Sequence, residues 1–315
     1  MIAPKPPIHL QIDQRQLPWR QKMTLCMAVA CELEDEPRIV LCHDWKEESD
    51  SIGSFEHTDK LTWVHDKWPT LTAGSSSRIE EILRLYRRHL KHTVLTEDNY
   101  FAEFKAPAQL FKAALADDYI QQMLGITYPY FLEFGKERLP EEIYRDRLAE
   151  IGRMTLQASL IIAGFLPGTP LGPLIPGLFP VICVIDGESF TDAVREETHF
   201  ASIGSGTFTA NAALYNRGAH EDMPLLGAIY AAFEAHRMSQ SVPGVGDAMS
   251  IDVLEPGGIV RDLSDEGYDY CEFLWKKFGP KGINEKQKTL FQMKDEFLGP
   301  DLSTPSTPET SKGQQ

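Results

Sequence analysis

The order of the apolar segments constrains the fold of this 315-residue chain more than any other feature. Each segment is assigned by its hydrophobic periodicity and by the turn residues that flank it. In chain order, the predicted elements are strands at 24–31, 38–43, 61–65 and 70–73, helices within 79–154, strands at 158–163 and 181–185, helices at 207–215 and after Asp222, a strand at 249–254, and a helix at 268–278. Two sheets packed face to face, with helices on both outer faces, satisfy this order. We therefore expect an α+β fold, a four-layer αββα sandwich.

Two predicted helices begin with a capping signal. Ser77 and Glu80 form a capping box, because each side chain can accept from the other residue's backbone amide. The apolar residues behind this box recur at helical spacing, at Ile79, Ile82, Leu83, Tyr86 and Leu90. Asp222 is the predicted cap of a later helix, with Pro224 near its first turn. The face of that helix carries Leu225, Leu226, Ile229, Ala232 and Phe233.

Composition excludes several classes of function. The net charge of −15 argues against binding to the phosphate backbone of a nucleic acid. The five cysteines include no CxxC pair, which favours reduced core thiols in a cytoplasmic protein over disulfides or a metal site.

Residues 1–22 lack the apolar region of a secretory signal. The uncharged segment 155–185 is long enough to cross a membrane, but its prolines would break a helix, so we expect two buried strands joined by a loop.

Four residues at fixed intervals suggest a catalytic site. Thr24 opens the first strand, Asp44 closes the second, Lys60 follows Asp44 by sixteen positions, and Gly74 follows Lys60 by fourteen. A threonine hydroxyl needs a base, and an N-terminal threonine carries one in its own α-amine. Lys60 would lower the pKa of both groups, Asp44 would hold Lys60 in place, and the Gly74 N–H would face the developing oxyanion. Taken singly, each residue is more typical of an ordinary strand, turn or loop.

The same order and the same two intervals occur in the proteasome β-subunit family and its bacterial two-component relatives, which the chain resembles. These proteins are N-terminal-nucleophile hydrolases. The resemblance covers about 24–92 and 158–258. It implies that Ser205, within Gly204-Ser205-Gly206, hydrogen-bonds the α-amine of Thr24, and that Ser239 belongs to the same network. His236 stands where many family members have an aspartate.

The resemblance also implies a substrate pocket and an assembly. The residues that match the pocket for the side chain before the scissile bond are Glu47, Thr58, Thr72, Ser76 and Glu80. A pocket with two acidic groups favours a basic side chain over a large apolar one, although Glu80 could serve only the helix cap. The family further implies polypeptide substrates and self-association into rings. An ATPase partner is left open, and no cofactor or metal is expected.

Thr24 must become N-terminal for this chemistry. Residues 1–23 are expected to be a leader removed by autolysis, or to precede the true start at Met23, whose removal would expose Thr24; we favour the second route. The peptidase domain would then span 24–298, with a helical insertion at about 93–154 and a disordered tail at 299–315. The alternatives are a non-catalytic ring subunit of the same fold and a hydrolase of small amides.

Overall fold

The computed structural model describes residues 24–34, 36–49, 53–56, 59–168, 177–187, 194–197, 199–279 and 298–301. For 46–49, 53–56 and 298–301 it describes the backbone alone. The expected leader at 1–23 lies outside the described residues, and so do residues 302–315 of the expected tail. The expectation of a tail from 299 on is wrong for residues 299–301, which belong to a strand that pairs with 259–263.

The larger sheet has six antiparallel strands and contains the first predicted hairpin. Its strand order is β10 (Phe200–Gly204), β1 (Leu25–Leu33), β2 (Glu36–Asp44), β11 (Met249–Glu255), β12 (Ile259–Leu263) and β13 (Leu298–Asp301). In the β1–β2 pair, Cys26 lies opposite His43. The start of β1 and the end of β2 therefore lie side by side at one end of the strands.

The second sheet has five antiparallel strands: β5 (Leu61–His65), β6 (Trp68–Gly74), β7 (Ala158–Pro167), β8 (Leu178–Ile185) and β9 (Val194–Glu197). The β7–β8 pair confirms that the uncharged segment forms two strands, while its predicted loop lies mainly outside the described residues. A separate two-stranded sheet joins β3 (Lys46–Ser49) to β4 (Gly53–Glu56). Within the described part of the chain, no helix is both long and apolar enough to cross a bilayer.

The two large sheets share one buried core. Cys26, Ala28 and Ala30 of β1 pack in a cluster with Ile161 and Ala163 of β7. The alternate residues of β1 face the other way, where Leu25, Met27 and Val29 join a cluster that contains α6. Because side chains alternate along a strand, both faces of β1 can be buried, and the strand is apolar throughout.

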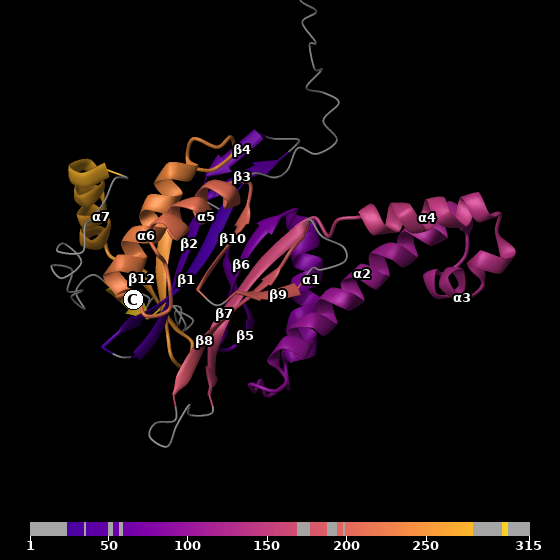
Figure 1. The fold of residues 1–315 in the computed structure, drawn as a ribbon, viewed down its shortest axis with the longest axis horizontal. Helices are drawn as coiled ribbons and strands as arrows, with labels where there is room; N and C mark the ends of the chain where they lie inside the picture. The colour runs from indigo at the N-terminus through magenta and orange to yellow at the C-terminus, as the bar shows by residue number, and fades with distance from the viewer. Residues whose placement is uncertain are drawn as a thin grey trace, which may run out of the picture.

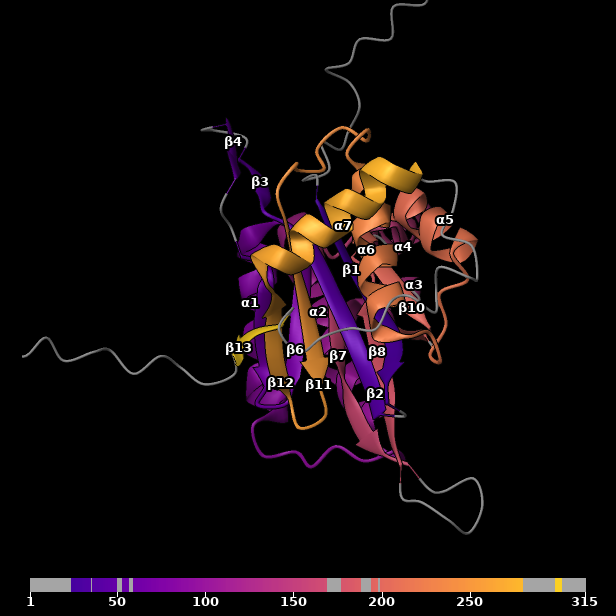
Figure 2. The same cartoon turned by 90° about the vertical axis from the view of Figure 1, so that its left-hand side faces the viewer.

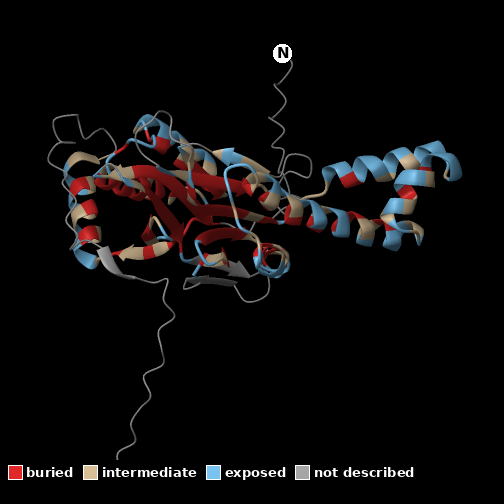
Figure 3. Ribbon diagram, turned by 90° about the horizontal axis from the view of Figure 1, so that it is seen from below, coloured by how far each residue is buried: buried red, intermediate tan, exposed pale blue. Residues whose placement is uncertain are grey.

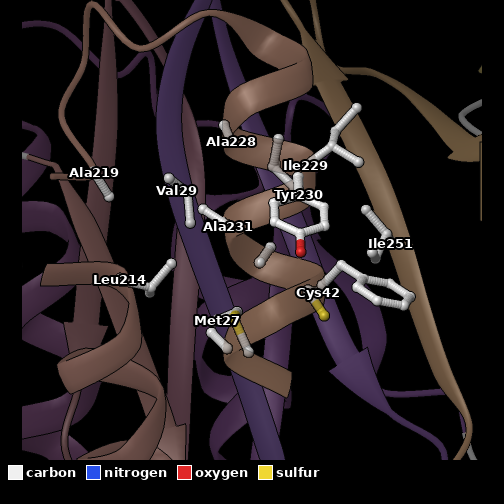
Figure 4. Packing of buried hydrophobic residues seen from close by; sticks show 14 of the residues in the cluster. Met27, Val29, Cys42, Leu214, Ala219, Ala228, Ile229, Tyr230, Ala231 and Ile251 are labelled. Carbon is white, nitrogen blue, oxygen red and sulfur yellow. The ribbon is translucent and has the colours of Figure 1, made fainter. Parts of the chain in front are cut away.

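Helices cover the outer face of each large sheet. On the six-stranded sheet lie α5 (Thr207–Asn216), α6 (Leu225–Ser239) and α7 (Asp265–Phe278), as Figures 1 and 2 show. Residues of α6 pack directly on β1, β2 and β11. Figure 4 shows two of these residues, Ile229 and Tyr230. On the five-stranded sheet lie α1 (Ser76–Leu90) and the first part of α2 (Tyr100–Leu124). The protein is thus an α+β protein with two large antiparallel sheets.

The expected helical insertion at about 93–154 contains three helices, and part of it projects beyond the two sheets. The second half of α2 packs with α3 (Tyr128–Arg138) and α4 (Glu141–Arg153) around a small core of Ala116, Ile120, Phe131 and Ile151. Figures 1 and 3 show these helices extending beyond the sheets, with mostly exposed surfaces.

Both predicted caps are wrong, and tertiary contacts explain why. Ser75 occupies the N-cap of α1, and its side chain makes no cap bond. Its amide donates to the Gln157 carbonyl of the neighbouring segment at 2.8 Å, which fixes the start of the helix at this residue. Ser77 therefore lies inside the helix. At α6 the N-cap is Pro224 rather than Asp222. The Glu32 amide at the end of β1 donates to the Met223 carbonyl at 3.0 Å, which holds the residues before Pro224 in an extended conformation. The apolar faces predicted for both helices are buried or half-buried.

Candidate active site

Thr24, Asp44 and Lys60 form a buried cluster where the two sheets meet. The Thr24 hydroxyl donates to Asp44 Oδ1 at 2.6 Å. The Lys60 ammonium donates both to the Thr24 hydroxyl oxygen and to the same Asp44 oxygen. The three residues are only 4%, 0% and 7% exposed. A buried ion pair is stable only when its hydrogen bonds are well satisfied, so this geometry fixes the threonine oxygen beside a cation.

The second oxygen of Asp44 is also bonded. Gly246, in the loop after α6, donates its N–H to Asp44 Oδ2 at 2.9 Å. The carboxylate thus accepts from a hydroxyl, an ammonium and a main-chain amide. Gly246 was not among the residues predicted from sequence, because a loop glycine distant in sequence carries no signal of its partner.

The Gly204-Ser205 segment contacts the main chain of Thr24. The Ser205 hydroxyl donates to the Thr24 carbonyl oxygen at 3.4 Å. Gly204 has φ +97°, and a Cβ there would overlap the same carbonyl oxygen, so only glycine fits. The structure therefore brings Ser205 to Thr24 as expected, although through the carbonyl group. The bond to a free α-amine stays a prediction, because Met23 precedes Thr24 in the chain.

Gly74 ends β6 on the facing sheet, and its backbone also requires glycine. Its φ is +120°, and a Cβ would lie 2.5 Å from the Gln157 carbonyl oxygen. The thiol of Cys26 donates to the Thr72 carbonyl at 3.3 Å. This bond holds the beginning of β1 against β6, two residues before Gly74.

Cys26 is excluded as the nucleophile by its surroundings. Burial raises the pKa of its thiol to about 12, against the smaller lowering effect of the Lys60 charge. The thiol therefore stays protonated, and its hydrogen bond to the Thr72 carbonyl uses that proton. The Lys60 ammonium hydrogen-bonds the hydroxyl of Thr24.

His236 and Ser239 lie on the last turns of α6, behind this cluster. The Ser239 hydroxyl donates to the Ala235 carbonyl at 2.8 Å and lies 3.4 Å from the Gly206 carbonyl. His236 is fully buried, and neither ring nitrogen has a hydrogen-bond partner among the described residues. Burial lowers the pKa of His236 to about 4, while Asp44 acts to raise it. The imidazole is therefore neutral near pH 7.

The expected pocket residues are only partly placed together. Thr72 is buried, and its hydroxyl donates to the Lys60 carbonyl at 3.4 Å. Ser76 and Glu80 lie exposed on the first turns of α1. Glu47 lies on β3, where the backbone alone is described, and Thr58 lies outside the described residues. In the described part of the chain, no cluster of His, Cys, Asp or Glu side chains has metal-binding geometry.

No protein-family model matches this chain, and no curated protein matches it significantly.

Proposed function

We propose that the protein is a threonine-type endopeptidase that uses Thr24 as an N-terminal nucleophile. The observation that carries this proposal is the contact of the Lys60 ammonium and the Asp44 carboxylate with the Thr24 hydroxyl. Such an arrangement is typical of an activated nucleophile, since a charged group next to the hydroxyl stabilises the developing alkoxide.

In the proposed reaction, the Thr24 Oγ1 attacks the carbonyl carbon of a peptide bond. The hydroxyl proton passes to the α-amine of Thr24, which becomes free once residues 1–23 are removed, and then to the leaving amine. Lys60 acts as a positive charge beside the hydroxyl. The product of this step is an ester between Thr24 and the acyl half of the substrate.

Water then hydrolyses the ester, with the α-amine as base, and restores the Thr24 hydroxyl. In both steps a negative charge develops on the carbonyl oxygen of the substrate. A main-chain N–H of Gly74 would stabilise this charge. Glycine is required at this position because a Cβ would meet the Gln157 carbonyl oxygen.

We also propose a four-layer architecture and an assembly into rings. The two sheets with a shared core and helices on both outer faces support the four-layer αββα sandwich of N-terminal-nucleophile hydrolases. Homo-oligomeric rings in the cytoplasm would enclose the sites and protect other proteins from cleavage. Light scattering at micromolar concentration would test this, and a monomer would contradict it.

Intact mass and peptide hydrolysis together test the activity. The chain translated from Met23 should lose that methionine, begin at Thr24 and cleave fluorogenic peptides and an unfolded protein. Thr24→Ala should abolish cleavage, whereas Thr93→Ala, at a helix end remote from the site, should leave it unchanged. If the protein from its own host retains residues 1–23, or if the processed chain is inactive, the proposal fails. Turnover of small amides with no cleavage of polypeptides would identify an amidase instead.

A further inference from the structure

The residues that precede the two charged groups of the site contact each other. His43 precedes Asp44 at the end of β2, and Asp59 precedes Lys60 before β5. The His43 Nε2 lies 3.5 Å from Asp59 Oδ1. The His43 side chain is 2% exposed, whereas that of Asp59 is 76% exposed. A second pair thus runs beside the Asp44–Lys60 ion pair and joins the same two segments, one from each large sheet.

The neighbours of His43 fix how its ring must be protonated. The Nδ1 atom lies 3.2 Å from the Asp44 carbonyl oxygen, which can only accept a hydrogen bond, so Nδ1 is the donor. Nε2 then faces two carboxylates, Asp59 at 3.5 Å and Asp252 Oδ2 at 3.9 Å. A lone pair on Nε2 would be repelled by both. One proton held among His43, Asp59 and Asp252 removes this repulsion.

Asp59 has a second contact that makes this pair relevant to Lys60. The same oxygen, Oδ1, accepts from the Leu61 amide at 2.8 Å. Asp59 therefore holds the backbone on both sides of Lys60, and His43 holds Asp59. Through its Nδ1 bond, His43 also contacts the main chain of Asp44.

We propose that His43 is a positioning residue, which, through one proton shared with Asp59 and Asp252, holds Asp44 and Lys60 in register across the two sheets. It does not touch substrate in this proposal. Its role at the reacting threonine rests on the proposed peptidase function, whereas the link between the two segments does not.

The electrostatics of the cluster agree with a shared proton. Burial lowers the pKa of His43, while Asp59 and Asp44 act to raise it and Lys60 to lower it. Burial raises the pKa of Asp252 to about 7, and the charges of Asp59 and Asp262 add to this. The charged and titratable groups around His43 include Asp44 on its own strand, Cys26 opposite it on β1, Asp59 and Lys60 before β5, and His236 on α6. They also include Asp252 on β11, with Asp262 opposite it on β12 and Tyr268 of α7 near it. As pH rises and the cluster loses its proton, the link should loosen.

Two measurements on the full chain test the link without any assay of activity. In Asp59→Asn, the pKa of His43 followed by NMR should fall by roughly one pH unit, because an attractive charge is lost. In His43→Ala, the amides of Leu61 and Gly246, which bond Asp59 and Asp44, should exchange about fivefold faster. His43→Gln, which keeps a donor toward Asp59, should restore part of this protection. Asp66→Asn, on the exposed turn at the other end of β5, is the matched control and should change neither quantity.

Kinetics on the processed chain test the consequence at the site. His43→Ala and Asp59→Ala should each lower kcat by about tenfold or more with little change in KM, since the nucleophile is misplaced but the substrate pocket is not. The double variant should be no worse than either single one. An unchanged His43 pKa in Asp59→Asn, or unchanged amide exchange in His43→Ala, would overturn the inference whether or not the protein cleaves peptides. If the His43 pKa and the amide exchange change as expected but the processed wild type cleaves no peptide, the peptidase proposal fails and the positioning role of His43 stands.

Discussion

The Gly246 N–H donates to Asp44 Oδ2 at 2.9 Å, although the two residues are 202 positions apart. This bond completes the carboxylate's contacts and ties the loop after α6 to the end of β2. The position of Asp44, and through it of Lys60 and Thr24, thus depends on a segment with no local sequence relationship to the site.

The Asp44–Lys60 pair should contribute to stability in a way that a double variant can reveal. Asp44→Ala removes the carboxylate that forms the ion pair with the buried Lys60 ammonium and should lower the free energy of unfolding by about 3–5 kcal/mol. Asp44→Ala combined with Lys60→Met removes both charges and should recover much of that loss. Urea unfolding measures both. Equal stability of the single and double variants would contradict a coupled buried pair.

Gly204→Ala should disturb Thr24 more than an equivalent change elsewhere. Both Gly204 (φ +97°) and Gly218 (φ +63°) have a left-handed backbone, but only a Cβ at Gly204 would meet the Thr24 carbonyl. We expect Gly218→Ala to cost about 1 kcal/mol and Gly204→Ala distinctly more, with loss of any cleavage activity. Thermal unfolding compares the two variants, and equal costs would argue against the close approach.

His236 should make the protein less stable in mild acid. Its pKa is lowered from 6.5 in the unfolded chain to about 4 in the fold. The unfolded state therefore binds more protons between these values, and the stability present above pH 6.5 is lost as pH falls toward 4, by about 3 kcal/mol.

His236→Gln removes this titration. Its free energy of unfolding, measured by urea at several pH values, should fall less steeply between pH 6.5 and 4 than that of the wild type. The comparison uses slopes, because glutamine in a buried site also changes the absolute stability. An identical slope would show that His236 is not buried in its neutral form.

Cleavage preference tests the predicted acidic pocket. Peptides that differ only in the residue before the scissile bond should be cut faster after Arg or Lys than after Leu or Tyr. Glu80→Gln should reduce that preference, whereas Glu81→Gln, at the adjacent exposed position and paired with Arg78, should not. Faster cleavage after Leu or Tyr by the wild type would disprove the acidic pocket.

The sequence by itself determined most of the local elements. The hairpin of β1 and β2, the β5–β6 and β7–β8 pairs and the helices α1, α5, α6 and α7 follow from periodicity and turn residues, which act between near neighbours. The sequence also singled out Thr24, Asp44 and Lys60, because their order and intervals are local features of the chain. It did not reveal the short strands β3, β4, β9, β10, β12 and β13, whose few residues carry too little pattern.

Only the tertiary structure decided what surrounds those residues. Ser75 and Pro224 begin their helices because neighbouring strands hold the preceding segments, which overrides the capping residues in the sequence. Likewise, Gly246 on Asp44 and Asp59 beside His43 come together through the packing of two sheets. Contacts of this kind depend on the closure of long loops and on buried polar groups finding partners, and neither leaves a periodic trace in the chain.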